Sequence, residues 1–351
     1  MEPMDIQSLL PEELEALVLE AGEKKYRAGQ LFEWFHKRLV MDYAEMTNLP
    51  QPFREKLKAG FPLKNLQMAQ VQVSEADGTR KYLFRLFDGN IIESVCMTYH
   101  HGNSVCISTQ AGCRMGCTFC ASTLDGLSRN LLPSEMLAQI YAIQTHTQQR
   151  VTNVVVMGTG EPLDNYENLL RFVQLLNHEK GCRISQRNIT VSTCGLVPQI
   201  RQLAEEGLQI TLALSLHAAT QAKREVLMPI AKAYNLTEVM EACKEYFAKT
   251  GRRMTFEYSL IEGENDSAQD VRELGELLKG LNAHVNLIPI NPIKEREYQR
   301  PNRQNVEKFK IKLEKYGINV TIRREMGSDI DGACGQLRKR FFEQAESEKP
   351  L

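Results

Sequence analysis

The stretch "SVCISTQAGCRMGCTFCAS", residues 104–122, joins a short apolar run to three closely spaced cysteines. The run "SVCIST" has the apolar and β-branched residues of a buried strand. Directly after it, Cys113, Cys117 and Cys120 follow one another in the spacing C-x3-C-x2-C, with no fourth cysteine beside them. A structural zinc site is normally closed by four protein ligands, so three cysteines leave a metal centre with one open position. The stretch therefore predicts a strand that leads into an incomplete metal centre.

The strand-then-helix pattern that begins here continues almost to the carboxyl end. Further strand-like runs are "TNVVVMG", "NITVST", "ITLALSLH", "MTFEYSLI", "HVNLIPI" and "NVTIRRE". Between them lie helical patterns such as "PSEMLAQIYAIQ" and "NYENLLRFVQLLN". Repeated β-then-α units imply parallel strands, and six or seven of them predict either a doubly wound sheet or a full or partial barrel.

Unusual polar residues follow these runs, and their distribution favours a barrel. In both architectures, functional side chains gather at the carboxyl ends of the strands. The first run leads into the cysteines, and later runs lead into "GTGEP" (158–162), Ser192, "SLH" (215–217) and Asn291. Side chains that converge from five strand ends fit the mouth of a barrel better than a single crevice.

The part of the chain before residue 104 has two different patterns. Residues 5–60 predict helices, among them "SLLPEELEALVLEAG" with Ser8 as the N-cap and "AGQLFEWFHKRL". Two alternating runs with Asp-Gly turns then predict a small hairpin or meander. We therefore expect four parts: a helical accessory domain (1–65), a β hairpin or linker (66–100), an α/β core (101–333) and a carboxyl-terminal segment (334–351).

Composition limits the possible partners. The 351 residues, 42% of them hydrophobic, can bury a large core. Nine cysteines, without a signal segment or a bilayer-spanning run, predict a cytoplasmic protein that does not contact membranes. The net charge of -1 gives no global attraction to nucleic acid. Residues 294–324 carry ten Lys or Arg against four Glu, which fits a solvated helix face and RNA contact equally well.

Three further features bear on function: a glycine-rich loop, a histidine at a strand end and a cysteine near the carboxyl end. "MGTGEP" lacks the third glycine of a dinucleotide fingerprint, which excludes NAD. His217 alone would more often be a core or loop histidine, but its place at a strand end favours a functional role. Cys334 in "GSDIDGACGQL" has small neighbours that let a substrate approach its sulfur, and the alternative is a glycine-rich turn with an incidental thiol.

The cysteine spacing resembles that of the radical S-adenosylmethionine superfamily. There, three thiolates hold a [4Fe-4S] cluster, and the fourth iron binds the amino and carboxylate groups of S-adenosylmethionine. Within the superfamily, the whole chain resembles the RlmN-type RNA adenine C2 methyltransferases. The resemblance rests on "FRLFDGNIIESV", "VCISTQAGCRMGCTFCAS", "MGTGEPLDN", "TVSTCGL", "LSLHA", "EYSLIEGEND", "NLIPINP" and "DIDGACGQL". It implies a partial (β/α)6 TIM-like barrel as the core.

The resemblance also implies roles for particular residues. Cys113, Cys117 and Cys120 would ligate the cluster. Cys334 would carry the methyl group, Cys106 would be the resolving cysteine and Glu93 the proton acceptor. Cys194 departs from the small residue usual in relatives, and "GTGEP" varies a glycine-rich loop, without removing a functional group. The residues implied to bind S-adenosylmethionine are Gly160, Glu161, Ser192, Ser215, Leu216, His217 and Asn291.

The implied chemistry follows from the nature of the adenine C2 atom. This carbon is electron-poor and cannot attack a methyl sulfonium, whereas a carbon radical can add to it. Two S-adenosylmethionine molecules would be used per turnover: one methylates Cys334, and the other yields the radical that activates this methyl group. Cys106 would then release the methylated RNA by forming a disulfide with Cys334, which thiol reductant reopens.

The resemblance implies RNA substrates and a protein electron donor. The substrates would be an adenosine in the peptidyl-transferase centre of 23S rRNA and the adenosine 3′ of the anticodon in some tRNAs. The electrons would come from a flavodoxin or ferredoxin, and the enzyme would act as a monomer. The helical amino-terminal domain and the basic 294–324 segment are the candidate RNA contacts.

The sequence also allows two alternative functions. The sister adenine C8 methyltransferases, which confer antibiotic resistance, share the cluster and both cysteines, although "GEPLDN" and "NLIPINP" resemble the C2 group more closely. A zinc-binding RNA-interaction protein without catalysis is the alternative from another class. Iron and sulfide would distinguish either methyltransferase from the zinc protein.

Overall fold

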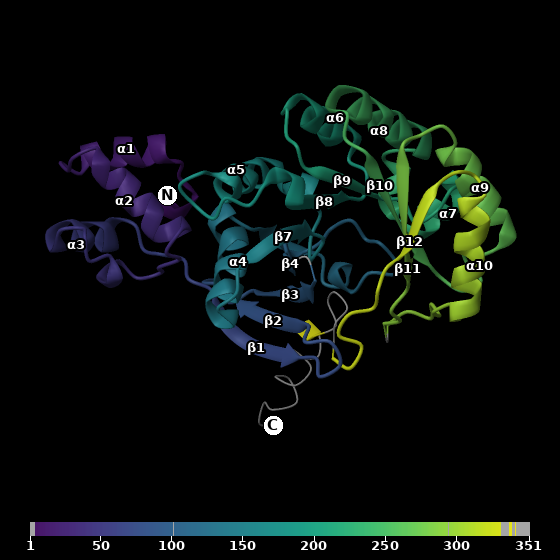
Figure 1. Ribbon diagram of the computed structural model, residues 1–351, viewed down its shortest axis with the longest axis horizontal. Coiled ribbons are helices and arrows are strands. Elements are labelled where there is room, and N and C mark those ends of the chain that lie inside the picture. Colours follow the sequence, from purple (N-terminus) through teal and green to yellow (C-terminus); the bar gives the residue numbers. More distant parts are fainter. Residues whose placement is uncertain (1–3, 101, 294, 331–336, 339–340, 342–351) are drawn as a thin grey trace.

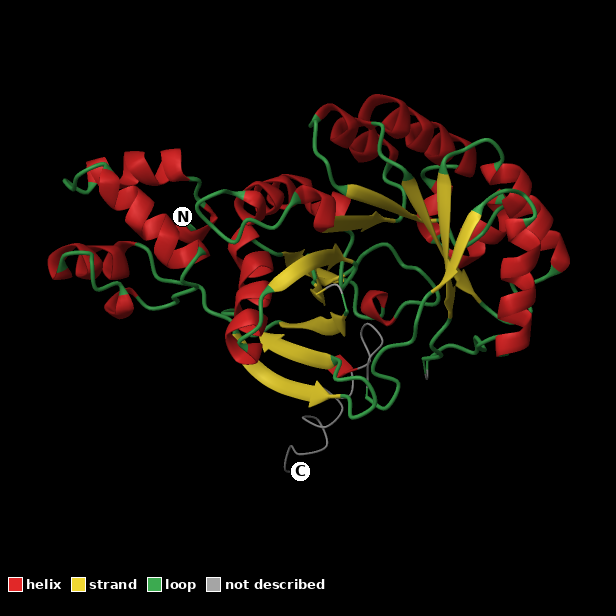
Figure 2. Cartoon of the chain, viewed as in Figure 1, coloured by secondary structure: helices red, strands yellow, loops and turns green. Residues whose placement is uncertain are grey.

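The computed structural model describes residues 4–100, 102–293, 295–330, 337–338 and 341. It consists of a small helical unit next to a larger α/β body (Figures 1 and 2). The body is built on one mixed sheet with the strand order β1-β2-β3-β4-β7-β8-β9-β10-β11-β12. A second, two-stranded sheet pairs β5 (Gln110–Gly112) with β6 (Leu127–Asn130).

The parallel part of the main sheet forms the predicted partial barrel. Its strands are β4 (Gly102–Cys106), β7 (Val151–Val156), β8 (Ile189–Thr193), β9 (Thr211–Ser215), β10 (Met254–Leu260), β11 (Ala283–Pro289) and β12 (Asn319–Ile322). Each of them pairs in parallel with the next. β1 and β12 are the two edges of the sheet, so the described strands form an open barrel. The predicted fold class is confirmed.

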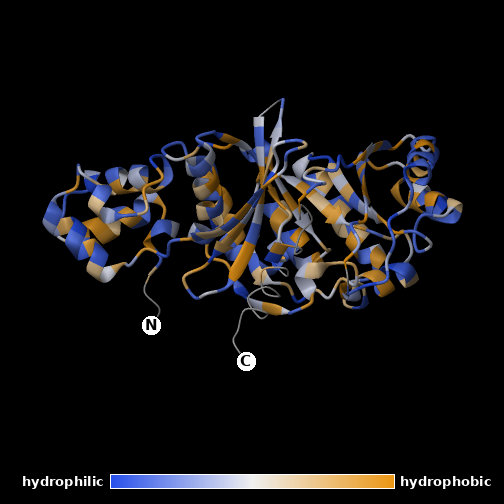
Figure 3. Cartoon of the chain, turned by 90° about the horizontal axis from the view of Figure 1, so that it is seen from below, coloured by the Kyte–Doolittle hydropathy of each residue, from blue (hydrophilic) through white to orange (hydrophobic). Residues whose placement is uncertain are grey.

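The helices between these strands cover the outer face of the sheet (Figures 1 and 2). They alternate with the strands along the chain, as the sequence pattern predicted. They are α4 (Pro133–Thr147), α5 (Tyr166–Asn177), α6 (Val197–Glu205), α7 (Gln221–Leu227), α8 (Leu236–Thr250), α9 (Ala268–Leu278) and α10 (Arg303–Glu314). Hydrophobic residues concentrate along the central strands (Figure 3), where Leu212, Leu214 and Val285 are fully buried. No helix in the described ranges is long and apolar enough to cross a membrane.

The meander before the barrel continues the same sheet. β1 (Gln67–Val73), β2 (Arg80–Arg85) and β3 (Ile91–Tyr99) pair in an antiparallel manner, and β3 pairs antiparallel with β4. Gly78 and Gly89 follow the turn aspartates with φ angles of 74° and 86°, which glycine adopts without strain. The predicted hairpin region is thus a three-stranded extension of the core sheet.

The amino-terminal unit contains α1 (Pro11–Glu20), α2 (Tyr26–His36) and α3 (Gln51–Gly60). The prediction of Ser8 as the cap of the first helix is wrong. The helix begins at Pro11, which lacks a backbone N–H and has a φ suited to a first helical position. The Glu13 carboxylate accepts the N–H of Leu10 at 2.7 Å. Ser8 instead accepts the backbone N–H of Ser134 at 3.0 Å, which ties the unit to the body.

Candidate active site

One pocket collects residues from the loops and strand ends at the carboxyl side of the parallel sheet. The chain segments that form it begin at β4, β7, β8 and β9, which are neighbours in the sheet. Glu257 of β10 and Ile288 of β11 complete its wall. We call it the cofactor pocket. It brings together most residues that the sequence proposed for the cluster and for S-adenosylmethionine, namely Cys113, Cys117, Cys120, Gly160, Glu161, Ser192, Ser215 and His217.

Backbone contacts fix the cysteine loop on both sides. The N–H of Cys113 donates to the carbonyl of Gly126 at 2.8 Å, and the N–H of Thr118 donates to the carbonyl of Leu227 at 2.9 Å. Gly112 has a φ of 80°, and a Cβ atom there would lie 2.0 Å from the Gly126 oxygen. Only glycine therefore fits at the start of the loop.

The thiols of this loop match the donor set of an iron–sulfur cluster with one open iron. None of the three forms a disulfide. Burial raises the pKa of Cys113 to about 12 and also raises that of Cys117, so both sulfurs are protonated in the metal-free chain. Metal binding would have to displace these protons. In the described chain, no three His, Cys, Asp or Glu side chains converge closely enough to hold a single metal ion.

A fourth cysteine lies close to the cluster motif, contrary to the expectation from the sequence. Cys194 follows β8 and lines the same pocket as the three motif cysteines. Burial and the nearby Glu161 carboxylate raise the pKa of its thiol, and its backbone N–H donates to that carboxylate at 2.8 Å. More than 70 residues separate it from Cys120 in the chain, and the parallel pairing of β4 with β7 and of β7 with β8 brings the two loops together.

The loop after β7 is held by close backbone packing and by a buried carboxylate. Gly160 has a φ of 112°, and a Cβ atom there would lie 2.7 Å from the Cβ of Gln110. The Glu161 carboxylate accepts the N–H of Leu163 at 3.0 Å and the N–H of Cys194 at 2.8 Å. Burial raises the pKa of Glu161, while these hydrogen bonds act in the opposite direction. Glu161 thus joins the loops that follow β7 and β8.

The proposed S-adenosylmethionine residues on β8 and β9 are not all exposed to the pocket. The hydroxyl oxygens of Ser192 and Ser215 lie 3.1 Å apart across the two neighbouring strands. Both line the pocket. Leu216 is fully buried, and its N–H donates to the carbonyl of Glu257 at 3.0 Å. Only its backbone position, next to Ser215 and His217, connects Leu216 to the site.

His217 has a defined tautomer and an unusual backbone conformation. Its φ of 56° is in the left-handed region, which is uncommon for a residue other than glycine. Nδ1 accepts the N–H of Ser259 at 2.9 Å, so the ring proton is on Nε2. Burial, with a smaller contribution from Arg224, lowers the pKa of His217 to about 3. The ring packs edge-on against Phe119 with centroids 4.8 Å apart. It is therefore a neutral hydrogen-bond donor in the cofactor pocket.

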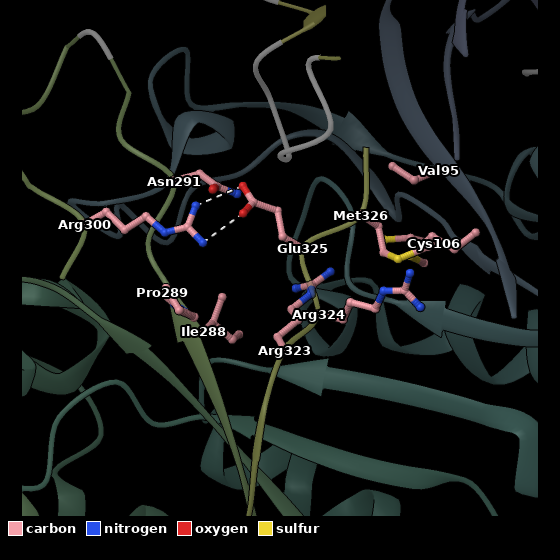
Figure 4. A pocket seen from close by; sticks show the side chains of 11 residues that line it. Val95, Cys106, Ile288, Pro289, Asn291, Arg300, Arg323, Arg324, Glu325 and Met326 are labelled. Carbon is pink, nitrogen blue, oxygen red and sulfur yellow. Dashed lines mark hydrogen bonds and ion pairs between the residues drawn. The ribbon is translucent and has the colours of Figure 1, made fainter. Parts of the chain in front are cut away.

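A second pocket lies beside the first and contains Cys106 and Asn291 (Figure 4). It shares Ile288 and Arg323 with the cofactor pocket. Cys106 is buried among apolar side chains that include Met326. The structure thus places Asn291 with the proposed resolving cysteine rather than among the other proposed S-adenosylmethionine residues.

The basic 294–324 segment contributes to this second pocket and to a solvated helix. Arg300, Arg323 and Arg324 line the pocket, and Arg300 forms two hydrogen bonds of 2.9 Å with Glu325 (Figure 4). On α10, Lys310 pairs with Glu314 one turn away. The segment therefore supplies both pocket-lining arginines and a solvated helix face, and RNA contact by it stays a prediction.

Glu93 lies on β3 and is held by two contacts. Its side chain is buried, and Oε2 is 3.0 Å from the Lys81 ammonium. Oε1 accepts the backbone N–H of Arg338 at 2.7 Å. Cys334, the proposed methyl carrier, lies outside the described residues. Leu337 is described, and it packs on Leu83 and Ile91 of the strands beside Glu93.

The sequence interpretation did not single out Glu257, although it lines the cofactor pocket. Its carboxylate accepts a hydrogen bond from the Asn286 side chain at 2.8 Å, and it is 5% exposed. Burial raises the pKa of Glu257, whereas Asn286 and Arg323 lower it. An acidic residue inside the apolar run "MTFEYSLI" was the available signal, because a buried parallel strand rarely contains one.

An open parallel barrel with a C-x3-C-x2-C loop at the carboxyl ends of its strands defines a radical S-adenosylmethionine enzyme. Residues 107–278 match the family model of the Radical SAM superfamily. Residues 4–61 match the model of the ribosomal RNA large subunit methyltransferase N-terminal domain. A crystal structure of a radical SAM methyltransferase from Sphaerobacter thermophilus superimposes with a TM-score of 0.91 at 43% identity and covers 95% of this chain and 99% of that one.

Curated relatives identify the family within this class. The "Probable dual-specificity RNA methyltransferase RlmN" of Lachnospira eligens is 58% identical, over 97% of this chain and 98% of that protein. The protein of the same name from Lachnoclostridium phytofermentans is 57% identical, over 98% of this chain and 96% of that protein. The chain belongs to the RlmN family of radical S-adenosylmethionine RNA methyltransferases.

Proposed function

We propose that the protein methylates C2 of an adenosine in the peptidyl-transferase centre of 23S rRNA and of the adenosine 3′ of the anticodon in some tRNAs. The observation that supports this most directly is the cofactor pocket itself. It combines the three thiols with Glu161, Ser192 and His217 at one end of an open barrel. The adjoining pocket with Cys106 offers the place where a base can meet the activated methyl group.

The residues in the cofactor pocket fit a [4Fe-4S] cluster and S-adenosylmethionine. Cys113, Cys117 and Cys120 would hold the cluster, which with S-adenosylmethionine supplies a 5′-deoxyadenosyl radical when bound. The loop of Gly160 and Glu161 would contact S-adenosylmethionine through its backbone, since the Glu161 carboxylate is already bonded to Leu163 and Cys194. Further hydrogen bonds to it would come from Ser192, Ser215 and the Nε2–H of His217, and from Asn291 at the border with the second pocket.

The covalent steps would use Cys334, Cys106 and Glu93. Cys334 accepts a methyl group as thiolate and, after activation of that group, becomes linked to C2 as a thioether. Glu93 takes the C2 proton, and the Cys106 thiolate then attacks the Cys334 sulfur. The bond between that sulfur and the transferred carbon breaks, the carbon takes up a proton to become the methyl group, and the methylated RNA leaves the new disulfide behind. The chain supports this grouping, because the backbone N–H of Arg338 donates to Glu93 and Arg338 is only four positions after Cys334. An extended chain of that length spans about 14 Å.

The stoichiometry and the partners follow from this scheme. Two S-adenosylmethionine molecules are used per turnover, one for Cys334 and one for the radical. A flavodoxin or ferredoxin supplies the electrons, and thiol reductant reopens the disulfide. In this scheme the enzyme acts as a monomer. Arg323 and Arg324 are the nearest candidates for contacts with the RNA backbone.

Mass spectrometry of nucleosides tests the proposal. The anaerobically prepared protein would be incubated with rRNA and tRNA lacking the modification, S-adenosylmethionine and reductant. We expect 2-methyladenosine in both RNAs. Its appearance in rRNA alone would reject the second substrate, and 8-methyladenosine would reject the C2 assignment. The absence of any methylated adenosine from a protein that contains iron and sulfide would overturn the proposal as a whole.

A further inference from the structure

Arg224, on the short helix α7, is a buried cation without a counter-charge among the residues that the structure describes. It is fully buried and is the largest of the fully buried side chains. One guanidinium nitrogen, Nη2, donates to the carbonyl of Cys194 at 2.6 Å and more weakly to that of Ser215 at 3.4 Å. Nε and Nη1 have no hydrogen-bond partner among the described residues. Such an arrangement is costly, because a buried charge is normally paired with an opposite charge.

Lys81 is another buried cation, and it is paired with an opposite charge. Its side chain is also fully buried, and its ammonium lies 3.0 Å from the Glu93 carboxylate. Arg224 has no carboxylate within ion-pair distance in the described ranges. The groups that interact with it electrostatically are the thiols of Cys194, Cys117 and Cys243. A thiol carries no charge until it ionises, so the metal-free chain leaves the guanidinium charge unbalanced.

The position of α7 relates this charge to the cysteine loop. The helix ends at Leu227, whose carbonyl accepts the N–H of Thr118, the residue after Cys117. The carbonyl of Cys194 accepts the shorter of the two hydrogen bonds from Arg224. Cys194 also lines the cofactor pocket, together with Cys117. Arg224 itself is not part of the pocket lining. It lies behind the cysteines, where it can act on them without touching a bound molecule.

We propose that Arg224 is a positioning residue for the iron–sulfur cluster, whose buried positive charge offsets the negative charge of the thiolate-bound cluster. This inference rests on the proposed ligation by Cys113, Cys117 and Cys120. Ionisation of Cys117 on metal binding creates the missing counter-charge, so Arg224 favours retention of the cluster. Reduction adds one more negative charge to the cluster, so Arg224 also makes reduction easier.

Three full-length variants separate charge from shape. Arg224→Met removes the charge and keeps much of the side-chain volume, and Arg224→Lys keeps the charge but not the fork of hydrogen bonds. Arg201→Gln is the matched control, because it removes an arginine from an exposed pair with Glu245 on the outside of α6. All are prepared anaerobically with iron and sulfide, and the cluster midpoint potential is measured by redox titration followed by electron paramagnetic resonance.

We expect Arg224→Met to shift the reduction equilibrium about tenfold toward the oxidised cluster, which is about 59 mV more negative for a one-electron couple. Arg224→Lys should stay closer to the wild type, and Arg201→Gln should match it. Arg224→Met should also lose iron to a chelator several times faster than the wild type. An unchanged midpoint potential in Arg224→Met would overturn the inference.

The melting temperature of the metal-free proteins excludes a purely structural role. If Arg224 serves the cluster, metal-free Arg224→Met melts at or above the wild-type temperature, since the change removes an unpaired buried charge. Misfolding of the metal-free variant, or a clearly lower melting temperature, would show that the guanidinium is needed for the fold and would also overturn the inference. A wild-type protein that takes up no iron and sulfide would instead reject the proposed cluster itself.

Discussion

At the scale of single residues, the cofactor pocket contains four cysteines, three from one loop and one from another. Cys113, Cys117 and Cys120 lie on one short loop, whereas Cys194 comes from the loop after β8, where its backbone N–H donates to the Glu161 carboxylate. Because Cys194 is not part of the C-x3-C-x2-C loop, we do not expect it to replace a loop cysteine as a cluster ligand. The distinction is open to a direct test.

We expect Cys117→Ala to abolish cluster binding, because two thiolates of the loop cannot hold the cubane. Cys194→Ala is the matched control in the same pocket, and it should retain the cluster. Iron and sulfide analysis, with the absorption spectrum of the anaerobic proteins, measures both. A full cluster in Cys117→Ala, or its loss in Cys194→Ala, would contradict the ligand assignment.

His36 on α2 gives a prediction about pH. Burial, together with His178, lowers its pKa from 6.5 to about 3. The unfolded chain therefore binds a proton between these values that the folded chain does not, so the free energy of unfolding falls as the pH falls below about 6.5. The contribution is up to about 1.4 kcal/mol per pH unit.

Replacement of His36 by Gln should make the free energy of unfolding less dependent on pH, by up to about 1.4 kcal/mol per pH unit. Denaturant unfolding of the iron-free protein between pH 7 and pH 4.5 measures it. His217 and His284 should retain part of the acid sensitivity, since burial lowers their pKa in the same direction. Equal slopes for the wild type and His36→Gln would show that His36 does not resist protonation in the folded protein.

At the scale of elements, two loops that follow parallel strands contain a glycine with a positive φ, and only one of these glycines has close neighbours. Gly160 and Gly263 both have a positive φ, of 112° and 76°. A Cβ at Gly160 would lie 2.7 Å from Gln110, whereas nothing lies within 4 Å of one at Gly263. An alanine would therefore strain the backbone at both positions, but its Cβ would clash with a neighbour only at position 160.

Gly160→Ala should displace the loop that carries Glu161 and weaken S-adenosylmethionine binding at least tenfold. Gly263→Ala should only lower stability, by about 1–2 kcal/mol for a left-handed alanine, and leave binding intact. Equilibrium binding of S-adenosylmethionine to the reconstituted proteins decides between them. Equal affinities in the two variants would remove the loop from the proposed binding site.

The strands and helices of the core could be predicted from the sequence because their signals are local. Runs such as "ITLALSLH" are apolar and short, and the polar residue that follows each run marks its carboxyl end. Burial and pairing across the sheet are not local. The sequence therefore missed Glu257 and Arg224, and it could not show that Asn291 lines the pocket that adjoins the cofactor pocket. The first helix was misjudged at its cap, because Pro11 and Glu13 outweigh Ser8 there.

At the scale of the whole molecule, the two candidate RNA-contacting regions lie at opposite ends. The helices α1 to α3 form one end of the long axis, and α10 lies near the other (Figure 1). Glu13 of α1 forms hydrogen bonds of 2.6 and 2.9 Å with Arg171 of α5, and His36 bonds to Tyr141 of α4 at 2.9 Å. The helical unit is thus anchored to the barrel at a fixed place.

The central claim is that methyl transfer to RNA proceeds through a covalent bond to Cys334 that Cys106 resolves. The two cysteines must then fail in different ways. Cys334→Ala removes the methyl acceptor, so neither methylated RNA nor an adduct forms. Cys106→Ala permits addition to the base but blocks release, so the protein accumulates linked to RNA.

A denaturing gel of Cys106→Ala after turnover, with and without nuclease and with Cys334→Ala beside it, is the most direct measurement. We expect a shifted band in Cys106→Ala that nuclease removes, and no such band in Cys334→Ala. If both cysteines were only structural, each substitution would cost about 1–3 kcal/mol of stability without an adduct. The absence of a nuclease-sensitive band from Cys106→Ala, in a preparation that holds its cluster, would contradict the covalent mechanism.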